Sequence, residues 1–181
     1  MPTPTYTIVC QELYAARQHL YDMVRPLSQD ELLWVPPRPD GVCVSYHFGH
    51  MALQEDTMIA ATTGKPRLAT PELDDAFGAR NANNGGARFP SGAVIIDYMQ
   101  RVRQLTIGLL ALRFRAIRSE AQAVETAELF RQIVNHDYSH TKYIRRICRE
   151  MGKPEVEAPS ATLVVADEQA IAGPQYHIPG W

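Results

Sequence analysis

Apolar residues recur at intervals of three and four along four stretches of the chain, which is the pattern that amphipathic helices produce. The first stretch runs from about Tyr6 to Val24. The second runs from about Ser45 to Thr62, and Ser45 is a favourable N-cap residue. The third begins after Ser91, and the fourth ends before Gly152. We therefore expect four long helices.

The apolar residues of these stretches predict how the helices pack. On one face, the third stretch carries Val94, Tyr98, Val102, Leu105, Leu109 and Leu112. On one face, the fourth carries Phe130, Ile133, His136, His140, Ile144, Ile147 and Met151. Four helices with one apolar stripe each bury those stripes most simply against each other. The pattern thus predicts an all-α fold, a four-helix bundle.

The connections between the helices differ in character. The spacing of Ser28 and Glu31 is that of a capping box and predicts one short turn over residues 30–33. Residues 64–90 have no long periodic pattern, and such a connection is either a binding loop or lid, or a surface excursion. No Gly or Pro marks the break between the third and fourth helices, which we place within residues 117–125.

The chain divides into two parts on this pattern. Residues 1–154 contain the predicted bundle. Residues 155–181 form a tail with a short apolar run and an aromatic end, which we expect to pack on the bundle or on a partner subunit.

Composition narrows the class of protein without indicating its chemistry. The chain has 181 residues, of which 45% are hydrophobic and 21% are charged, with a formal net charge of −2. These values are typical of one folded domain and argue against a disordered chain. A charge so near neutrality gives no electrostatic case for a nucleic-acid partner.

The N-terminus and the cysteines indicate the compartment. The first residues have no basic region followed by an apolar one, so they do not resemble a secretory signal. No apolar run approaches the ~18–20 residues that span a bilayer. The cysteines, Cys10, Cys43 and Cys148, are widely spaced and odd in number, which argues against a disulfide framework. We expect a cytoplasmic protein with no membrane partner.

Two histidines occupy positions where bundle packing favours leucine or isoleucine. His136 and His140 are four residues apart, so both lie on the apolar face of the last helix. Burying an unpartnered imidazole costs roughly 1–3 kcal/mol. A divalent metal would offset this cost by binding both rings, and so would hydrogen bonds from other buried groups. The pair alone leaves both interpretations open.

The second helix supplies a third candidate ligand. If Tyr46, Leu53 and Thr57 face inward, His50 does as well, and Gly49 beside it allows another helix or a ligand to approach closely. Cofactor and metal sites in bundles are built from facing helices in this way. The other histidines, His19 and His177, are more typical of core or surface residues.

The sequence also resembles a known family. The segment from Leu27 to Trp34, the segment Ser45–Glu55 with its His-Phe-Gly-His, and the spacing of His136 and His140 resemble motifs of the DinB-like (DinB/YfiT) metalloenzyme superfamily. The resemblance covers about residues 6–150. It implies an up-down-down-up bundle, which in this family is often dimeric.

The resemblance assigns roles to individual residues. It implies that His50, His136 and His140 bind a divalent metal, most commonly nickel or zinc, with iron and manganese as further candidates. Glu55, Asp137 and His47 match positions whose side chains could support the ligands from outside. Ser139, Lys142 and Tyr143 depart from the family's usual residues, so the subfamily and the substrate stay open.

The family also suggests an activity. Some of its members join low-molecular-weight thiols to electrophiles, which implies a metal-dependent thiol S-transferase acting on a small molecule. Two alternatives come from other classes: a stress-related bundle that binds a small molecule without catalysis, and a metal-dependent hydrolase. No Gly-x-Ser-x-Gly or Cys–His signature supports a nucleophilic side chain.

Overall fold

The computed structural model describes residues 4–39, 41–78 and 89–154. These residues form six helices and no strand, so the prediction of an all-α fold is confirmed. The helices are α1 (Pro4–Val24), α2 (Gln29–Leu33), α3 (Val44–Thr63), α4 (Pro71–Phe77), α5 (Gly92–Ala116) and α6 (Glu120–Glu150). The tail predicted for residues 155–181, His177 and part of the 64–90 connection lie outside the described residues.

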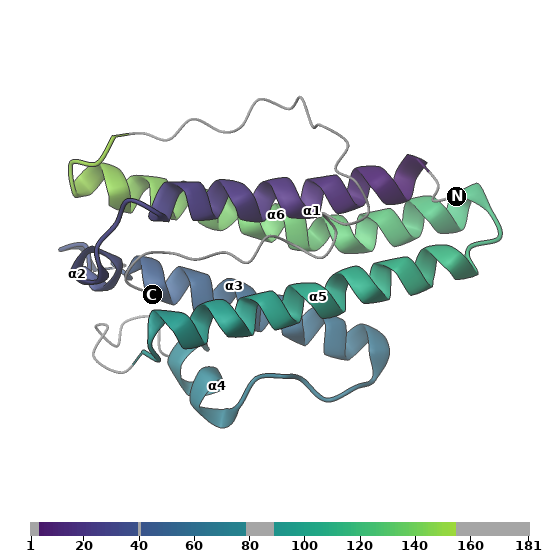
Figure 1. The fold of residues 1–181 in the computed structure, drawn as a ribbon, viewed down its shortest axis with the longest axis horizontal. Coiled ribbons are helices and arrows are strands. Elements are labelled where there is room, and N and C mark those ends of the chain that lie inside the picture. The colour runs from purple at the N-terminus through teal and green to yellow at the C-terminus, as the bar shows by residue number, and fades with distance from the viewer. Residues whose placement is uncertain (1–3, 40, 79–88, 155–181) are drawn as a thin grey trace.

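The four long helices lie side by side as a bundle (Figure 1). α1 and α6 run in one direction, and α3 and α5 run in the other. α1 packs most extensively on α6 and α3 on α5, while α3 also contacts α6. None of the helices in the described ranges is long and apolar enough to cross a membrane.

The core of the bundle consists of two apolar clusters at opposite ends. One joins the C-terminal ends of α1 and α6 to the N-terminal ends of α3 and α5, with Leu20, Phe48, Met99 and Ile147 among its fully buried side chains. The other joins the opposite ends, with Leu13, Leu110 and Phe130. Buried charged residues lie between the two clusters along the bundle axis.

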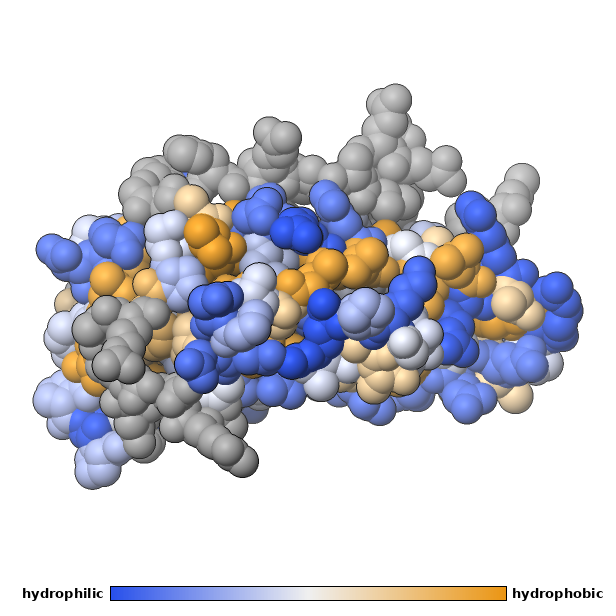
Figure 2. Space-filling model, turned by 90° about the horizontal axis from the view of Figure 1, so that it is seen from below, coloured by the Kyte–Doolittle hydropathy of each residue, from blue (hydrophilic) through white to orange (hydrophobic). Residues whose placement is uncertain are grey.

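The apolar stripe predicted for α5 is wrong at three positions. Val94, Leu105 and Leu112 are 48%, 46% and 63% exposed, whereas Tyr98 and Val102 are buried as predicted. The core face of α5 also carries Ile95, Met99, Arg103, Thr106 and Leu110. The predicted stripe therefore lies to one side of the core face, because that face contains polar residues. Figure 2 shows apolar side chains in a band along one surface of the bundle.

α3 starts within one residue of the predicted position, but the predicted N-cap is wrong. The helix begins at Val44 with Cys43 as N-cap, so Ser45 lies inside the first turn and is buried. Thr57, predicted to face inward, is exposed. The end is as expected, because Gly64 adopts the left-handed conformation, with φ of 69°, that terminates a helix.

The two short helices, α2 and α4, begin at different capping signals. α2 has the predicted capping box between Ser28 and Glu31. α4 was not predicted, although its signal is present: the Thr70 side chain accepts from the backbone N–H of Leu73, and Pro71 stands at the first helical position. Residues 71–77 are therefore a helix rather than part of an irregular connection.

α4 is held against α3 by local bonds. The Asp56 carboxylate accepts the backbone N–H groups of Leu68 and Ala69 at 3.1 and 2.8 Å, and it accepts the Tyr98 hydroxyl at 2.9 Å. These bonds fix the chain that leads from α3 into α4. Phe77, the last residue of α4, lies beside Gly49 and His50 near the start of α3.

Candidate metal centre

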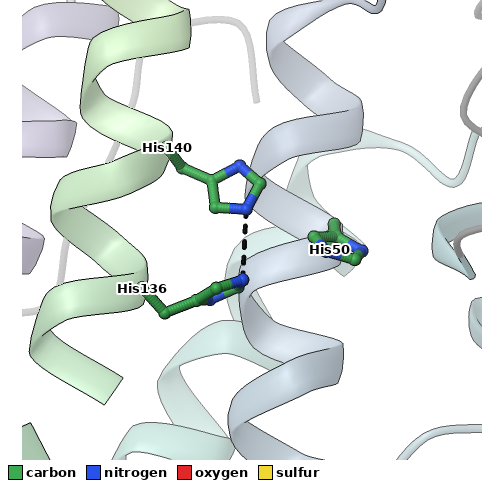
Figure 3. A group of neighbouring side chains, drawn as sticks. All are labelled: His50, His136 and His140. Atoms are coloured by element: carbon green, nitrogen blue, oxygen red, sulfur yellow. Dashed lines mark hydrogen bonds between the residues drawn. The ribbon is translucent and has the colours of Figure 1, made fainter. Parts of the chain in front are cut away.

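Three histidines from two facing helices converge in the bundle. His50 lies on α3, and His136 and His140 lie on α6 (Figure 3). Each offers one ring nitrogen, and these three nitrogens all lie within 4.8 Å of one another. The Nε2 atoms of His136 and His140 are 3.2 Å apart. The group could hold a metal ion, as the sequence predicted.

The geometry suits a first-row divalent metal. Imidazole nitrogens bind zinc at about 2.0–2.1 Å, which places two ligands of a tetrahedral site about 3.3 Å apart. The separation of 3.2 Å between His136 and His140 matches this value. The His50 nitrogen lies within 4.8 Å of both. The residues present therefore fit a bound divalent metal ion, which the family resemblance implied.

The position of the pair on α6 follows from helical spacing. His140 is 8% exposed and lies on the same face as Ile133 and Ile144, which are 3% and 0% exposed. His136 and His50 are half-buried. The site therefore has a closed side at His140 and a more open side at His50 and His136.

His50 is oriented by α4. Its Nδ1 lies 3.0 Å from the Phe77 carbonyl oxygen, which can only accept, so Nδ1 carries the proton. The lone pair is then on Nε2. Gly49 permits this contact, because a Cβ at this position would lie 2.3 Å from the Phe77 ring. The expectation that Gly49 allows a close approach is confirmed, and the approaching element is α4.

His47 contacts the site from its closed side. Its Nδ1 lies 2.8 Å from Nδ1 of His140, and its side chain is buried, with 4% exposed. The Tyr143 ring stacks on His47 with a centroid distance of 5.6 Å, and the Tyr46 ring stacks on His50 at 5.5 Å. Two aromatic rings thus restrict the rotation of these two imidazoles.

The environment keeps the imidazoles neutral. Burial, with smaller effects from the neighbouring histidines, lowers the pKa of His140 to about 2. Burial, His50 and Arg38 lower the pKa of His47 to about 3. Burial also lowers the pKa of His136. Neutral imidazole is the form that binds metal, so His136 and His140 are ready to act as ligands at pH 7.

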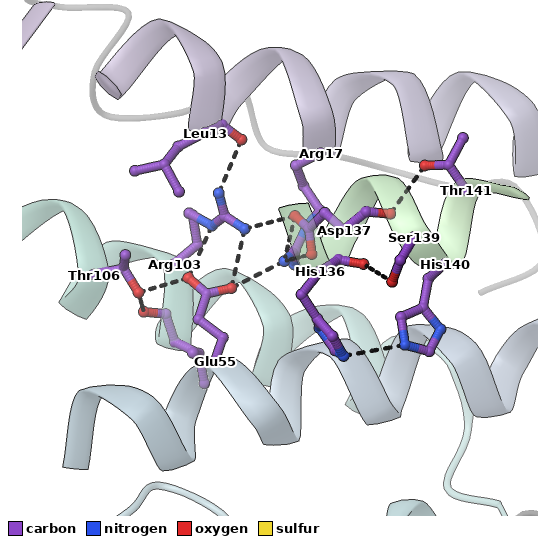
Figure 4. Close-up of polar contacts among 11 residues, drawn as sticks. Leu13, Arg17, Glu55, Arg103, Thr106, His136, Asp137, Ser139, His140 and Thr141 are labelled. Carbon is purple, nitrogen blue, oxygen red and sulfur yellow. Dashed lines mark hydrogen bonds and ion pairs between the residues drawn. The ribbon is translucent and has the colours of Figure 1, made fainter. Parts of the chain in front are cut away.

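Beside the histidines, four charged residues form a layer across the bundle (Figure 4). We call Arg17, Glu55, Arg103 and Asp137 the charged layer; each comes from a different long helix. Asp137 accepts from Arg17 at 3.1 Å and from Arg103 at 2.9 Å. Glu55 accepts from Arg17 at 2.9 Å and from Arg103 at 3.0 Å. The two positive and two negative charges balance.

Further bonds complete the charged layer. Thr106 donates to Glu55 at 2.5 Å, and Arg103 donates to the Leu13 carbonyl at 2.8 Å. Burial alone would lower the pKa of Arg17, but Asp137 and Glu55 more than offset this and raise it. The described bonds of Glu55 and Asp137 thus go to the arginines and Thr106, not to the histidines. Glu55 lies on α3, the helix of His50, and Asp137 lies on α6, the helix of His136 and His140.

The charged layer was missed in the sequence, although a signal was present. Each member follows a buried apolar residue of its helix by four positions, the pairs being Leu13 and Arg17, Met51 and Glu55, Met99 and Arg103, and Ile133 and Asp137. A charged residue four positions after a core residue lies on the core face. Buried charges need partners, so four such positions would have indicated an internal ion-pair network.

The remaining candidates lie apart from this centre. His19 is 1% exposed, and its Nε2 lies 3.3 Å from Nη2 of Arg145. Cys10, Cys43 and Cys148 are buried free thiols, and burial raises the pKa of Cys43 to about 11. Within the described residues, His50, His136 and His140 are the one group of this kind that could bind a metal.

The comparisons with known proteins agree with this geometry. The sequence pattern of the DinB superfamily matches residues 12–144, which include most of the chain and all three converging histidines. The chain belongs to the DinB superfamily, whose members bind metals. A search of curated proteins found no match.

Proposed function

We propose that this protein is a metal-dependent enzyme that transfers a small thiol to a small electrophile. One observation carries the proposal: one ring nitrogen each from His50, His136 and His140 lies within 4.8 Å of the other two, and burial lowers the pKa values of His136 and His140. Three protein ligands are the set that catalytic metal sites use, with other positions left for water or substrate. When bound, a divalent ion supplies Lewis acidity that lowers the pKa of a coordinated water or thiol.

The buried cysteines indicate that the reacting thiol belongs to a separate small molecule and not to the protein. All three cysteines are buried, and burial raises the pKa of each thiol, so none is a ready thiolate. The half-buried side chains of His50 and His136 place the open side of the site toward solvent. In the reaction, the thiol sulfur bonds to the electrophilic carbon, the leaving group departs with its electron pair, and the thiol proton goes to solvent.

The proposed activity also implies the binding partners and the cellular location of the protein. The substrates are small molecules, and no membrane or nucleic acid takes part. Free, buried cysteines are typical of a reducing compartment, which supports a cytoplasmic location. We also propose a homodimer, since large apolar side chains are exposed on α5.

A turnover assay tests the activity. The metal-loaded protein would be incubated with glutathione, cysteine and other small thiols, each with 1-chloro-2,4-dinitrobenzene, and C–S bond formation followed by absorbance. We expect turnover with at least one thiol and loss of turnover in His136→Ala. The His19→Ala variant is the matched control and should keep the activity. Metal binding without turnover would favour the small-molecule-binding protein, and ester cleavage without S-transfer would favour the hydrolase.

A further inference from the structure

We propose that two built-in hydrogen-bond acceptors, Nδ1 of His47 and the backbone carbonyl of Phe77, hold His140 and His50 as Nε2 ligands. This inference rests on the proposed metal site and adds how the ligating nitrogens are selected. An imidazole can bind a metal through either nitrogen, and the hydrogen bond of the other nitrogen decides which one is available.

For His140, metal binding at one ring nitrogen would decide the tautomer. Nδ1 faces His47 Nδ1 at 2.8 Å, and Nε2 faces His136 Nε2 at 3.2 Å. Each contact between two ring nitrogens needs one proton, which either ring can supply. If Nε2 of His140 held the metal, the one proton of this neutral ring would be on Nδ1. His140 would then donate that proton to Nδ1 of His47.

His47 is suited to accept this proton. It is buried 2.8 Å from His140, and its Nδ1 has a lone pair when the proton of the His47 ring is on Nε2. The stacked ring of Tyr143 holds the imidazole plane. His47 is therefore a positioning residue: it acts on the metal through His140 and is not itself a ligand.

For His50, the acceptor is supplied by a different element. The Phe77 carbonyl at the end of α4 lies 3.0 Å from Nδ1. This distance depends on Gly49, because a Cβ there would lie 2.3 Å from the Phe77 ring, and α4 would have to move away. Gly49 is thus part of the site although it has no side chain.

Substitutions at His47 test the first acceptor. In His47→Leu the acceptor is lost, whereas in His47→Asn the side-chain oxygen takes the place of Nδ1. Affinity for Zn²⁺ would be measured by competition with a chromophoric chelator. We expect His47→Leu to weaken binding about 10- to 100-fold, and His47→Asn to restore most of it. His19→Leu, which removes another buried histidine, should bind Zn²⁺ as the unsubstituted protein does.

The tautomers can be read directly in the unsubstituted protein. Long-range ¹H–¹⁵N correlation of the Zn²⁺-loaded protein should show protons on Nδ1 of His140 and His50 and on Nε2 of His47. A proton on Nε2 of His140, or equal affinities of the His47→Leu and unsubstituted proteins, would overturn the inference. If the unsubstituted protein binds no divalent metal at all, the proposed function fails instead.

Substitutions of glycine test the second acceptor. Gly49→Ala should displace Phe77 and weaken Zn²⁺ binding, with loss of the protected Nδ1 proton signal of His50. Gly108→Ala is the matched control on α5, because a Cβ there meets no atom within 4 Å. If Gly49→Ala keeps both the affinity and the His50 proton signal, α4 has no part in selecting the nitrogen.

Discussion

The charged layer offers the sharpest test of how the bundle is held together around the site. Asp137, which is 1% exposed, accepts bonds from both Arg17 and Arg103. The Asp137→Asn variant keeps the volume but leaves two buried guanidinium groups with Glu55 as their one carboxylate partner among the described residues. Breaking a buried ion pair by removing one partner costs about 3–5 kcal/mol, so we expect a loss of this size in the free energy of unfolding.

The assay is urea unfolding at pH 7 with a chelator present, so that bound metal does not contribute. Asp97→Asn is the matched control, since Asp97 pairs with Arg101 at 3.7 Å and its side chain is 67% exposed. An exposed pair contributes about 0–1 kcal/mol. Adding Arg17→Met to Asp137→Asn restores neutrality, so the double variant should lose less than the sum of the two single losses. A loss below about 1 kcal/mol for Asp137→Asn would refute the reasoning.

Three further outcomes are expected. In the metal-free protein, stability should fall as the pH drops from 7 to 5. His140 and His47 are neutral when folded, with pKa values of about 2 and 3, and protonate near pH 6.5 when unfolded. Urea unfolding at each pH measures this, and a flat profile would count against neutral, buried rings. Ser28→Ala should cost about 1 kcal/mol in the same assay, because it removes the capping box of α2; an unchanged midpoint would mean that the cap contributes nothing. Light scattering should give about twice the chain mass of 20.3 kDa, and a monomer mass would contradict the proposed homodimer.

The sequence predicted those features that depend on spacing within one helix. The bundle, the capping box at Ser28 and the inward position of His140 all follow from which residues share a helical face. The convergence of His50 with His136 and His140 needed the resemblance as well, because spacing alone cannot place two helices side by side.

The error in the stripe of α5 arose because polar residues occupy core positions. α5 buries Arg103 and Thr106, so its outer apolar face, with Leu105 and Leu112, gave the stronger pattern. The buried arginines become favourable only when carboxylates from other helices reach them, and that pairing is a property of the tertiary structure. For the same reason, the contact between His47 and His140 could not be derived from either helix alone.

Metal analysis of the untagged protein tests the central claim most directly. The content of nickel, zinc, iron and manganese would be measured in the unsubstituted protein and in His50→Ala, His136→Ala, His140→Ala and His19→Ala. We expect about one divalent ion per chain in the unsubstituted protein and in His19→Ala, and loss of the ion in the other three variants. Full occupancy in folded His136→Ala would contradict the account.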